Sequence, residues 1–192
     1  MKIGVLASQG AFVEHIAILR HLGVDAVTVR LPQGLDGLDG LIIPGGESTS
    51  ISRLMHDYDL TSKIIELAKN GLPIWGTCAG MILLASETSD SKVEPLGIMN
   101  ITVKRNAFGR QRDSFETSLR IPALGEKPFP GVFIRAPVIE QVNDGLEILA
   151  RLGNGSIVAA RQGKLLASAF HPELTDDLRF HQYFLDIIAG KR

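Results

Sequence analysis

Residues 73–84 read PIWGTCAGMILL and contain the only cysteine of the chain, Cys78. The pattern predicts a short buried strand, a tight turn and then an apolar helix. Gly76 and Gly80 flank the cysteine as G-x-C-x-G, the thiol counterpart of the G-x-S-x-G nucleophile elbow. Backbone segments come close together at such a turn, so a side chain at either glycine would clash. The pattern therefore predicts an accessible nucleophile beside a helix N-terminus, which favours a thiolate. A buried structural cysteine also fits it.

Strand and helix patterns alternate from the N-terminus to this elbow. Apolar runs predict strands, and a period of 3.6 residues predicts the helices between them. The expected strands are 2–7, 25–29, 41–44 and the one that begins at 73, and the expected helices are 12–22, 51–55 and 61–69. This alternation is typical of a doubly wound α/β sheet, mostly parallel, in which sites form at the carboxyl ends of the strands.

After about residue 86 the chain has strand-like runs without long helices between them. They are 98–104, 115–121, 131–135, 138–142, 146–152, 156–161 and 165–170. We expect them to form an antiparallel or mixed extension of the same sheet, so that residues 1–192 make one domain. A last helix is predicted near 176–189, with Thr175 as its N-cap.

Composition excludes several classes of protein. The formal net charge is −1, which argues against a partner made of nucleic acid or anionic lipid. Apolar residues make up 45% of the chain, enough for a sizeable core, yet no run approaches the length of a membrane span. One cysteine cannot form an internal disulfide. We expect a cytoplasmic protein.

His171 is the expected base for the thiol. It follows the apolar strand 165–170, where the sheet ends and sites form. Glu173 stands two residues further on, and in extended backbone such residues point to the same side. A carboxylate there can hold the imidazole in the right tautomer, as the third member of a catalytic triad does. The alternative is a His-Pro-Glu turn with no role.

The other histidines are not expected to take part in catalysis. His15, His21 and His56 lie in helical patterns, so we place them at the surface or the boundary of the core. His181 falls on the apolar stripe of the last helix, which indicates core packing. A metal site built from His171, Glu173 and His181 lacks a third well-spaced ligand, so no metal is expected.

An oxyanion hole is the second requirement of a thiol mechanism. The backbone N–H of Ala79, directly after the nucleophile, is one donor. Gly45 and Gly46 follow a strand and allow close approach to a substrate, so they offer another. The segment 47–50 then opens a helix beside the same pocket, although its serines and threonine also suit a simple N-cap.

Three segments carry this chemistry, and together they resemble the class I (triad) glutamine amidotransferases: 44–48, 76–80 and 170–173. Three more are similar to the glutaminase subunits of pyridoxal 5′-phosphate synthase, the PdxT/SNO family: 7–12, 108–116 and 133–137. A lone G-x-C-x-G is a weak signal, but the ordered set of six is specific and covers nearly the whole chain. The resemblance implies a flavodoxin-like sheet.

The resemblance also implies a reaction, the hydrolysis of L-glutamine to L-glutamate and ammonia through a thioester. Cys78 would attack the side-chain amide. His171 would take the thiol proton and pass one to the ammonia, and Glu173 would orient His171. The backbone N–H groups of Gly46 and Ala79 would hold the oxyanion.

The glutamine pocket is implied residue by residue, as Gly46, Glu47, Ser48, Arg105, Ile134 and Arg135. An arginine there makes physical sense, because a guanidinium fork matches an α-carboxylate.

The same family passes its ammonia to a TIM-barrel synthase subunit, in a large hetero-oligomer that builds pyridoxal 5′-phosphate. Gln9, at the carboxyl end of the first strand, would face the synthase and help to complete the oxyanion hole. The chain has no phosphate-binding loop and no evident lysine site for pyridoxal phosphate, so we expect no cofactor in it. Isolated, it is expected to be a poor glutaminase.

Two other functions remain open from the residues themselves. One is a peptidase-like cysteine hydrolase that uses the same elbow; Glu173 and the Gly45-Gly46 pair favour the amidotransferase. The other is a non-catalytic regulatory or binding module, against which the intact Cys78, His171 and Glu173 argue.

Overall fold

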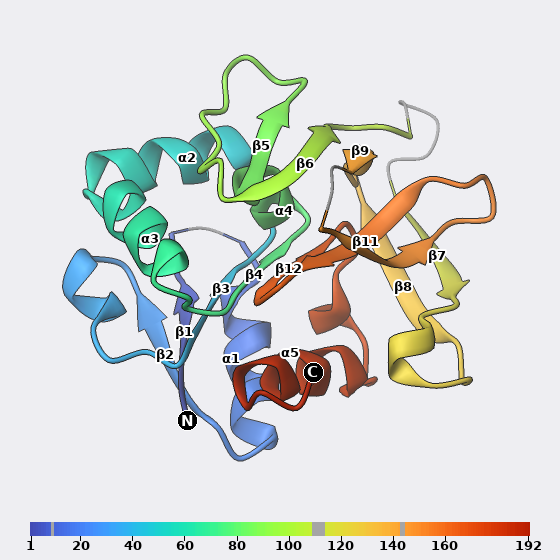
Figure 1. Cartoon of the computed structure of the whole chain (residues 1–192), viewed down its shortest axis with the longest axis horizontal. Coiled ribbons are helices and arrows are strands. Elements are labelled where there is room, and N and C mark those ends of the chain that lie inside the picture. The colour runs from blue at the N-terminus through green and yellow to red at the C-terminus, as the bar shows by residue number, and fades with distance from the viewer. Residues whose placement is uncertain (9, 109–113, 143–144) are drawn as a thin grey trace.

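The structure is a computed structural model that describes residues 1–8, 10–108, 114–142 and 145–192. Within these ranges, ten strands form one mixed sheet in the order β2-β1-β3-β4-β12-β11-β9-β6-β5, with β10 paired to β11 (Figure 1). The strands are β1 (Lys2–Leu6), β2 (Asp25–Val29), β3 (Gly40–Ile43), β4 (Ile74–Thr77), β5 (Ala85–Thr88), β6 (Met99–Lys104), β9 (Val138–Val142), β10 (Glu147–Arg151), β11 (Ile157–Gln162) and β12 (Leu165–Ser168).

The first half of the sheet is parallel. Its strands β2, β1, β3, β4 and β12 pair side by side in one direction. Helices α1 (Phe12–His21) and α5 (Arg179–Ile188) lie together on one side of these strands, and α2 (Ser48–Asp57) and α3 (Leu60–Lys69) lie on the other (Figure 1). Both faces are therefore covered, and every residue of β3 and β4 is buried. The predicted doubly wound α/β fold is confirmed.

The parallel pairing brings separate segments to one edge of the sheet. Ile43 of β3 pairs with Gly76 of β4, and Thr77 of β4 pairs with Ser168 of β12. These strands end within a residue or two of each other, and the chain leaves all three at the same edge. The segments that follow them hold the candidate site residues, as expected for an open α/β sheet.

The later strands form the expected mixed extension, with two differences from the prediction. β11, β9 and β6 join it antiparallel, but β5, which the sequence pattern did not reveal, pairs parallel to β6. β7 (Ser114–Leu119) and β8 (Phe129–Ile134) do not enter the large sheet and pair with each other. Their inner side chains pack together and also against the common core: the rings of Phe115 and Phe133 stack 4.7 Å apart, and Phe133 meets Phe170 at 5.8 Å.

The predicted start of the last helix was wrong. A short 3₁₀ turn, Pro172–Leu174, follows His171, and α5 begins only at Arg179. Thr175 is not the N-cap of α5, which is Leu178; its hydroxyl accepts a hydrogen bond from the N–H of Asp177, within the intervening turn. Asp177 in turn accepts from the N–H of Arg179, so a carboxylate still lies at the positive end of the helix.

None of the helices in the described ranges has the length and apolar character needed to cross a membrane.

Candidate active site

Cys78 lies on a strained turn between β4 and α4 (Ala79–Leu84), with φ 49° and ψ −102°. A side chain on either flanking glycine has no room. A Cβ on Gly76 would lie 2.5 Å from the backbone of Gly80, and one on Gly80 would lie 1.9 Å from the carbonyl oxygen of Ile43. The close approach predicted from G-x-C-x-G is therefore present, and the strain falls on the residue expected to react.

The imidazole of His171 and the side chain of Cys78 border the same glycine. A Cβ on Gly45 would lie 2.5 Å from Cε1 of His171 and 3.3 Å from Cβ of Cys78. Only a glycine leaves space for both. Gly45 is itself anchored, because its N–H donates to Oγ1 of Thr77 over 3.0 Å. The ends of β3, β4 and β12 thus bring the candidate base beside the candidate nucleophile.

Glu173 holds the imidazole from its other side. Nδ1 of His171 lies 2.7 Å from Oε1 of Glu173, and both side chains are buried. Burial acts to lower the pKa of His171, but interactions with Cys78 and Glu173 outweigh it and raise that pKa to about 10. Nε2 is buried and has no aligned hydrogen bond to any described residue, so it is the ring nitrogen left to exchange a proton with the thiol.

A cavity of about 310 Å³ opens beside this pair. Its lining contains most of the residues predicted for the site, namely Gly46, Glu47, Ser48, Ala79, Arg105, Ile134, Arg135 and His171, and two that were not predicted, Ile82 and Asn106. Ser48 is almost fully buried, and its hydroxyl has no partner in the described part of the chain. A free polar group there can bind a small polar molecule.

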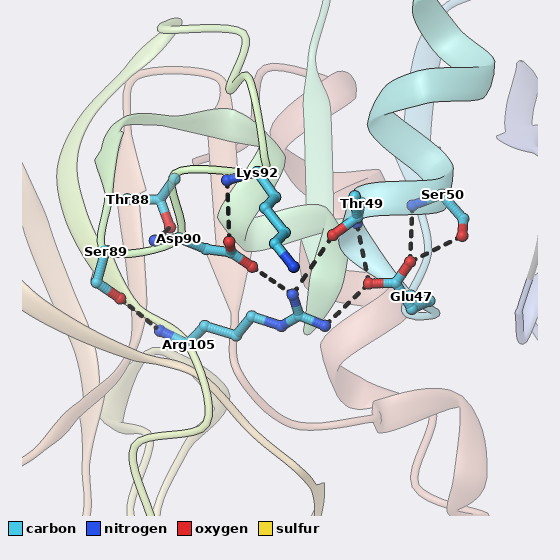
Figure 2. Close-up of polar contacts among 8 residues, drawn as sticks. All are labelled: Glu47, Thr49, Ser50, Thr88, Ser89, Asp90, Lys92 and Arg105. Carbon is cyan, nitrogen blue, oxygen red and sulfur yellow. Dashed lines mark hydrogen bonds and ion pairs between the residues drawn. The ribbon is translucent and has the colours of Figure 1, made fainter.

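Arg105, which lines the cavity, lies between two carboxylates (Figure 2). Nη2 donates to Oε1 of Glu47 over 2.9 Å, and Nη1 pairs with Asp90. Glu47 is also the N-cap of α2, since it accepts from the N–H groups of Thr49 and Ser50. Burial acts to raise the pKa of Glu47, but those hydrogen bonds outweigh it and hold the pKa near 2. We call Glu47, Asp90 and Arg105 the mouth cluster.

The end of β8 and the residue after it, Ile134 and Arg135, also line the cavity. The thiol of Cys78 lies 3.8 Å from the carbonyl oxygen of Ile134. Arg135 has a φ of 44°, a positive value that few residues other than glycine adopt. Gln9, the residue expected to meet a partner, lies outside the described residues, as do 109–113 of the predicted family segment.

His15 was placed wrongly from the sequence. It is fully buried rather than at the surface, and its Nε2 lies 3.3 Å from Oε2 of Glu173. His181 is buried as expected, but it also contacts His15. A signal was available, because His15 stands three residues after Phe12 and four before Leu19, on the apolar stripe of α1. No three side chains of the described residues are grouped to hold a metal ion.

Comparison with known proteins gives the family. Residues 5–189 match the model of the SNO glutamine amidotransferase family. The chain belongs to this family. The match spans nearly the entire chain, so it includes the elbow, the cavity lining and the His-Pro-Glu segment.

Individual relatives of the family are similar over their full length. The protein named pyridoxal 5′-phosphate synthase subunit PdxT from Herpetosiphon aurantiacus is 60% identical over 190 residues, 97% of this chain and 100% of its own. The PdxT subunit from Moorella thermoacetica is 57% identical, over 98% of this chain and 100% of its own. A crystal structure described as a glutamine amidotransferase superposes with a TM-score of 0.92 at 49% identity, covering 97% of this chain and 98% of the other.

Proposed function

We propose that this chain is a glutaminase that hydrolyses L-glutamine and supplies the ammonia to a pyridoxal 5′-phosphate synthase subunit. One observation carries the proposal: a strained cysteine and a buried His-Glu pair border the same glycine, beside a small cavity lined by charged groups. The relatives are named as subunits of that synthase, which supports the proposal that the ammonia is passed to the synthase subunit.

Each member of the triad has a defined part. Cys78, as the thiolate, attacks the side-chain carbonyl of glutamine. His171 accepts the thiol proton at Nε2 and gives a proton to the departing ammonia, and Glu173 keeps Nδ1 protonated throughout. Water then hydrolyses the thioester, with His171 as its base. The N–H groups of Gly46 and Ala79 stabilise the oxyanion of both steps, where losing one donor typically costs about 10²–10³ in rate.

The mouth cluster explains the choice of an amino acid as substrate. Glutamine carries an α-carboxylate and an α-ammonium group at the end opposite its amide. Arg105, with Arg135, offers guanidinium donors to the carboxylate, and Glu47 offers a carboxylate to the ammonium group. Ser48, Ile134 and the glycine backbone enclose the rest. A cavity of about 310 Å³ is at the small end of ligand sites, as a free amino acid requires.

The partner we propose is a TIM-barrel synthase subunit in a large hetero-oligomer, which docks where β1 ends and contacts Gln9. Docking completes the oxyanion hole and raises the rate of the isolated chain. Residues 1–192 act as one glutaminase domain. The cytoplasm is the proposed compartment, because a nucleophilic thiol must stay reduced.

Ammonia release from glutamine tests the proposal, with the chain alone and with an added synthase subunit. We expect slow release alone, a large increase with the synthase, and none from Cys78→Ala in either case. Short peptides should release nothing. Release by Cys78→Ala at the wild-type rate would overturn the mechanism, and equal rates with and without the synthase would overturn activation by docking. Cleavage of peptides in place of glutamine would identify a hydrolase of another class.

A further inference from the structure

Two histidines that the proposed reaction does not use lie directly behind Glu173. His15 is on α1, His181 is on α5, and both are fully buried. Nδ1 of His15 is 2.9 Å from Nε2 of His181, and Nε2 of His15 is 3.3 Å from Oε2 of Glu173. A continuous line of side chains thus runs from His181 through His15 and Glu173 to His171. Figure 1 shows α1 and α5, the helices that carry the two histidines, packed side by side.

Both rings are fixed by their surroundings. The indole of Trp75 meets His15 edge-on at 5.5 Å and His181 edge-on at 5.0 Å between ring centroids. Nε2 of His15 also lies 3.5 Å from Oγ1 of Thr77, which accepts from the N–H of Gly45. His15 therefore contacts both Glu173, which holds His171, and Thr77, which holds the backbone of Gly45.

The two histidines are neutral. Burial, helped by the neighbouring His181 and His171, lowers the pKa of His15 far below its usual value. Burial lowers the pKa of His181 to about 3. A neutral imidazole has one N–H and one bare nitrogen, so in the contact between the rings one histidine donates and the other accepts.

Two arguments select the donor. If His15 donated from Nδ1, its bare Nε2 could accept from the hydroxyl of Thr77 at 3.5 Å, but it would also face Oε2 of Glu173 at 3.3 Å, lone pair against carboxylate. His181 would then carry its proton on Nδ1, which has no partner among the described residues, and a buried N–H without an acceptor is rare. If His181 donates from Nε2, both problems disappear: His15 presents an N–H to Glu173, and the bare Nδ1 of His181 leaves no donor unpaired.

We propose that His15 and His181 form a positioning dyad for Glu173, in which His181 sets the tautomer of His15 and His15 holds its Nε2–H beside Oε2. The inference rests on the proposed glutaminase function for its catalytic meaning. The side chain of Glu173 is fully buried, and a buried carboxylate needs donors on both oxygens. His171 serves Oε1. The Nε2 contact with Oε2, at 3.3 Å, is not aligned as a hydrogen bond; Nε2 makes its aligned hydrogen bond with Oγ1 of Thr77 at 3.5 Å, so its N–H acts on Oε2 as a close dipole.

Two substitutions at one position separate positioning from packing. In His15→Leu the ring is replaced by an apolar side chain without a donor. In His15→Gln the amide nitrogen falls near the place of Nε2 and can still donate to Glu173. His56→Leu is the matched control, because that side chain is 80% exposed. The measurements are kcat and KM with the synthase present, thermal midpoints, and an NMR titration of the His171 ring.

In His15→Leu we expect kcat to fall about 10- to 100-fold, the usual range for losing a hydrogen bond to a charged group. KM should change less than about twofold, since no substrate contact is lost. The pKa of His171, which is raised to about 10, should fall as Glu173 loses its support. His15→Gln should recover most of kcat and of the His171 pKa, and the control should change neither.

The dyad is refuted if folded His15→Leu keeps both kcat and the His171 titration of the wild type. It is also refuted if His15→Gln and His15→Leu lose activity equally, since packing alone then accounts for the loss. Should the wild type hydrolyse no glutamine, the proposed function fails, yet the titration of His171 in the two variants still decides whether His15 supports Glu173.

Discussion

The mouth cluster and the histidines around Glu173 are two networks of polar and charged side chains near the same site, and they differ in their contact with water. Side chains of the mouth cluster are 16% to 43% exposed. We call His15, His171, Glu173 and His181 the buried cluster; His15 and Glu173 have no exposed surface, and His171 has 8%. Water can replace a lost partner at the mouth but not in the buried cluster.

The difference suggests separate tasks. A network open to water can exchange its partners for the charged end of a substrate at little cost, which suits binding. A network closed to water holds its groups in one arrangement, which suits catalysis, because fixed dipoles need no reorganisation during the reaction. Substitutions in the buried cluster should therefore change kcat, and substitutions in the mouth cluster should change KM.

Glu173→Gln should have the largest effect. The amide keeps the size of the side chain but carries no charge, and its NH₂ group can favour the wrong tautomer of His171. An equivalent change in another catalytic triad lowers kcat by about 10⁴, so we expect a fall of about 10³–10⁴ with KM nearly unchanged. Steady-state kinetics of ammonia release measures both constants. Glu116→Gln on β7 is a matched control, and a kcat within tenfold of the wild type would remove the distinction between the clusters.

The grouping of Cys78, His171 and Glu173 in space was predictable from the sequence, because its signals are local. The two glycines around Cys78 and the spacing of His171 and Glu173 need only short stretches of chain. Even the cavity lining followed from a family likeness. The parallel strands were equally plain, since full burial leaves continuous apolar runs in β3 and β4.

The parts that were missed depend on contacts between distant segments. His15 lies on the stripe of α1, but only the fold places it between Glu173 and His181. The strands β7 and β8 alternate like any half-buried strand, and nothing in their pattern says that they pair only with each other. The start of α5 was misjudged because Thr175 and Asp177 satisfy a turn as readily as a helix N-terminus.

Arg105→Lys should have the next largest effect, and on the other kinetic constant. Lysine keeps the charge but loses the planar fork that reaches Glu47 and Asp90 together. We expect KM for glutamine to rise about 10- to 100-fold, the cost of one or two charged hydrogen bonds, with kcat within about threefold. Arg53→Lys is the control, because that side chain is 82% exposed and its ion pair with Asp57 lies in contact with water. A fall in kcat without a change in KM would assign Arg105 to the chemistry instead.

The two clusters should also respond to different ranges of pH. The pKa values of His15 and His181 are lowered by burial, so the unfolded chain binds protons below about pH 6.5 that the folded chain refuses. Stability should fall as the pH drops from 6.5. The contribution of His171, whose pKa is raised to about 10, is complete below 6.5 and is lost as the pH rises through 10.

Glu47 affects stability at lower pH. Its pKa is lowered to about 2, so its contribution is present above about 4.5 and is lost as the pH falls towards 2. Urea midpoints at pH 5, 6.5 and 9 should therefore peak near 6.5. Between pH 5 and 6.5, the slope of the midpoint against pH should come from the two buried histidines. His181→Leu should flatten that slope while Glu47→Gln leaves it unchanged. The same slope in wild type and His181→Leu would show that the buried histidines do not titrate on unfolding.

Asp90→Asn should have the smallest effect, and it tests how strongly Asp90 fixes the position of Arg105. Asp90 pairs with Arg105 and accepts from the N–H of Lys92, and the amide can keep only part of this network (Figure 2). Arg105 retains Glu47 as a partner and can turn to water, so the loss in stability should stay below about 1 kcal/mol. KM should rise about two- to fivefold, because Arg105 is less well placed for the α-carboxylate. Urea unfolding and steady-state kinetics measure the two effects. An effect on KM as large as that of Arg105→Lys would mean that Asp90 fixes the guanidinium rigidly, and the contrast between an exchangeable mouth and a fixed interior would then not hold.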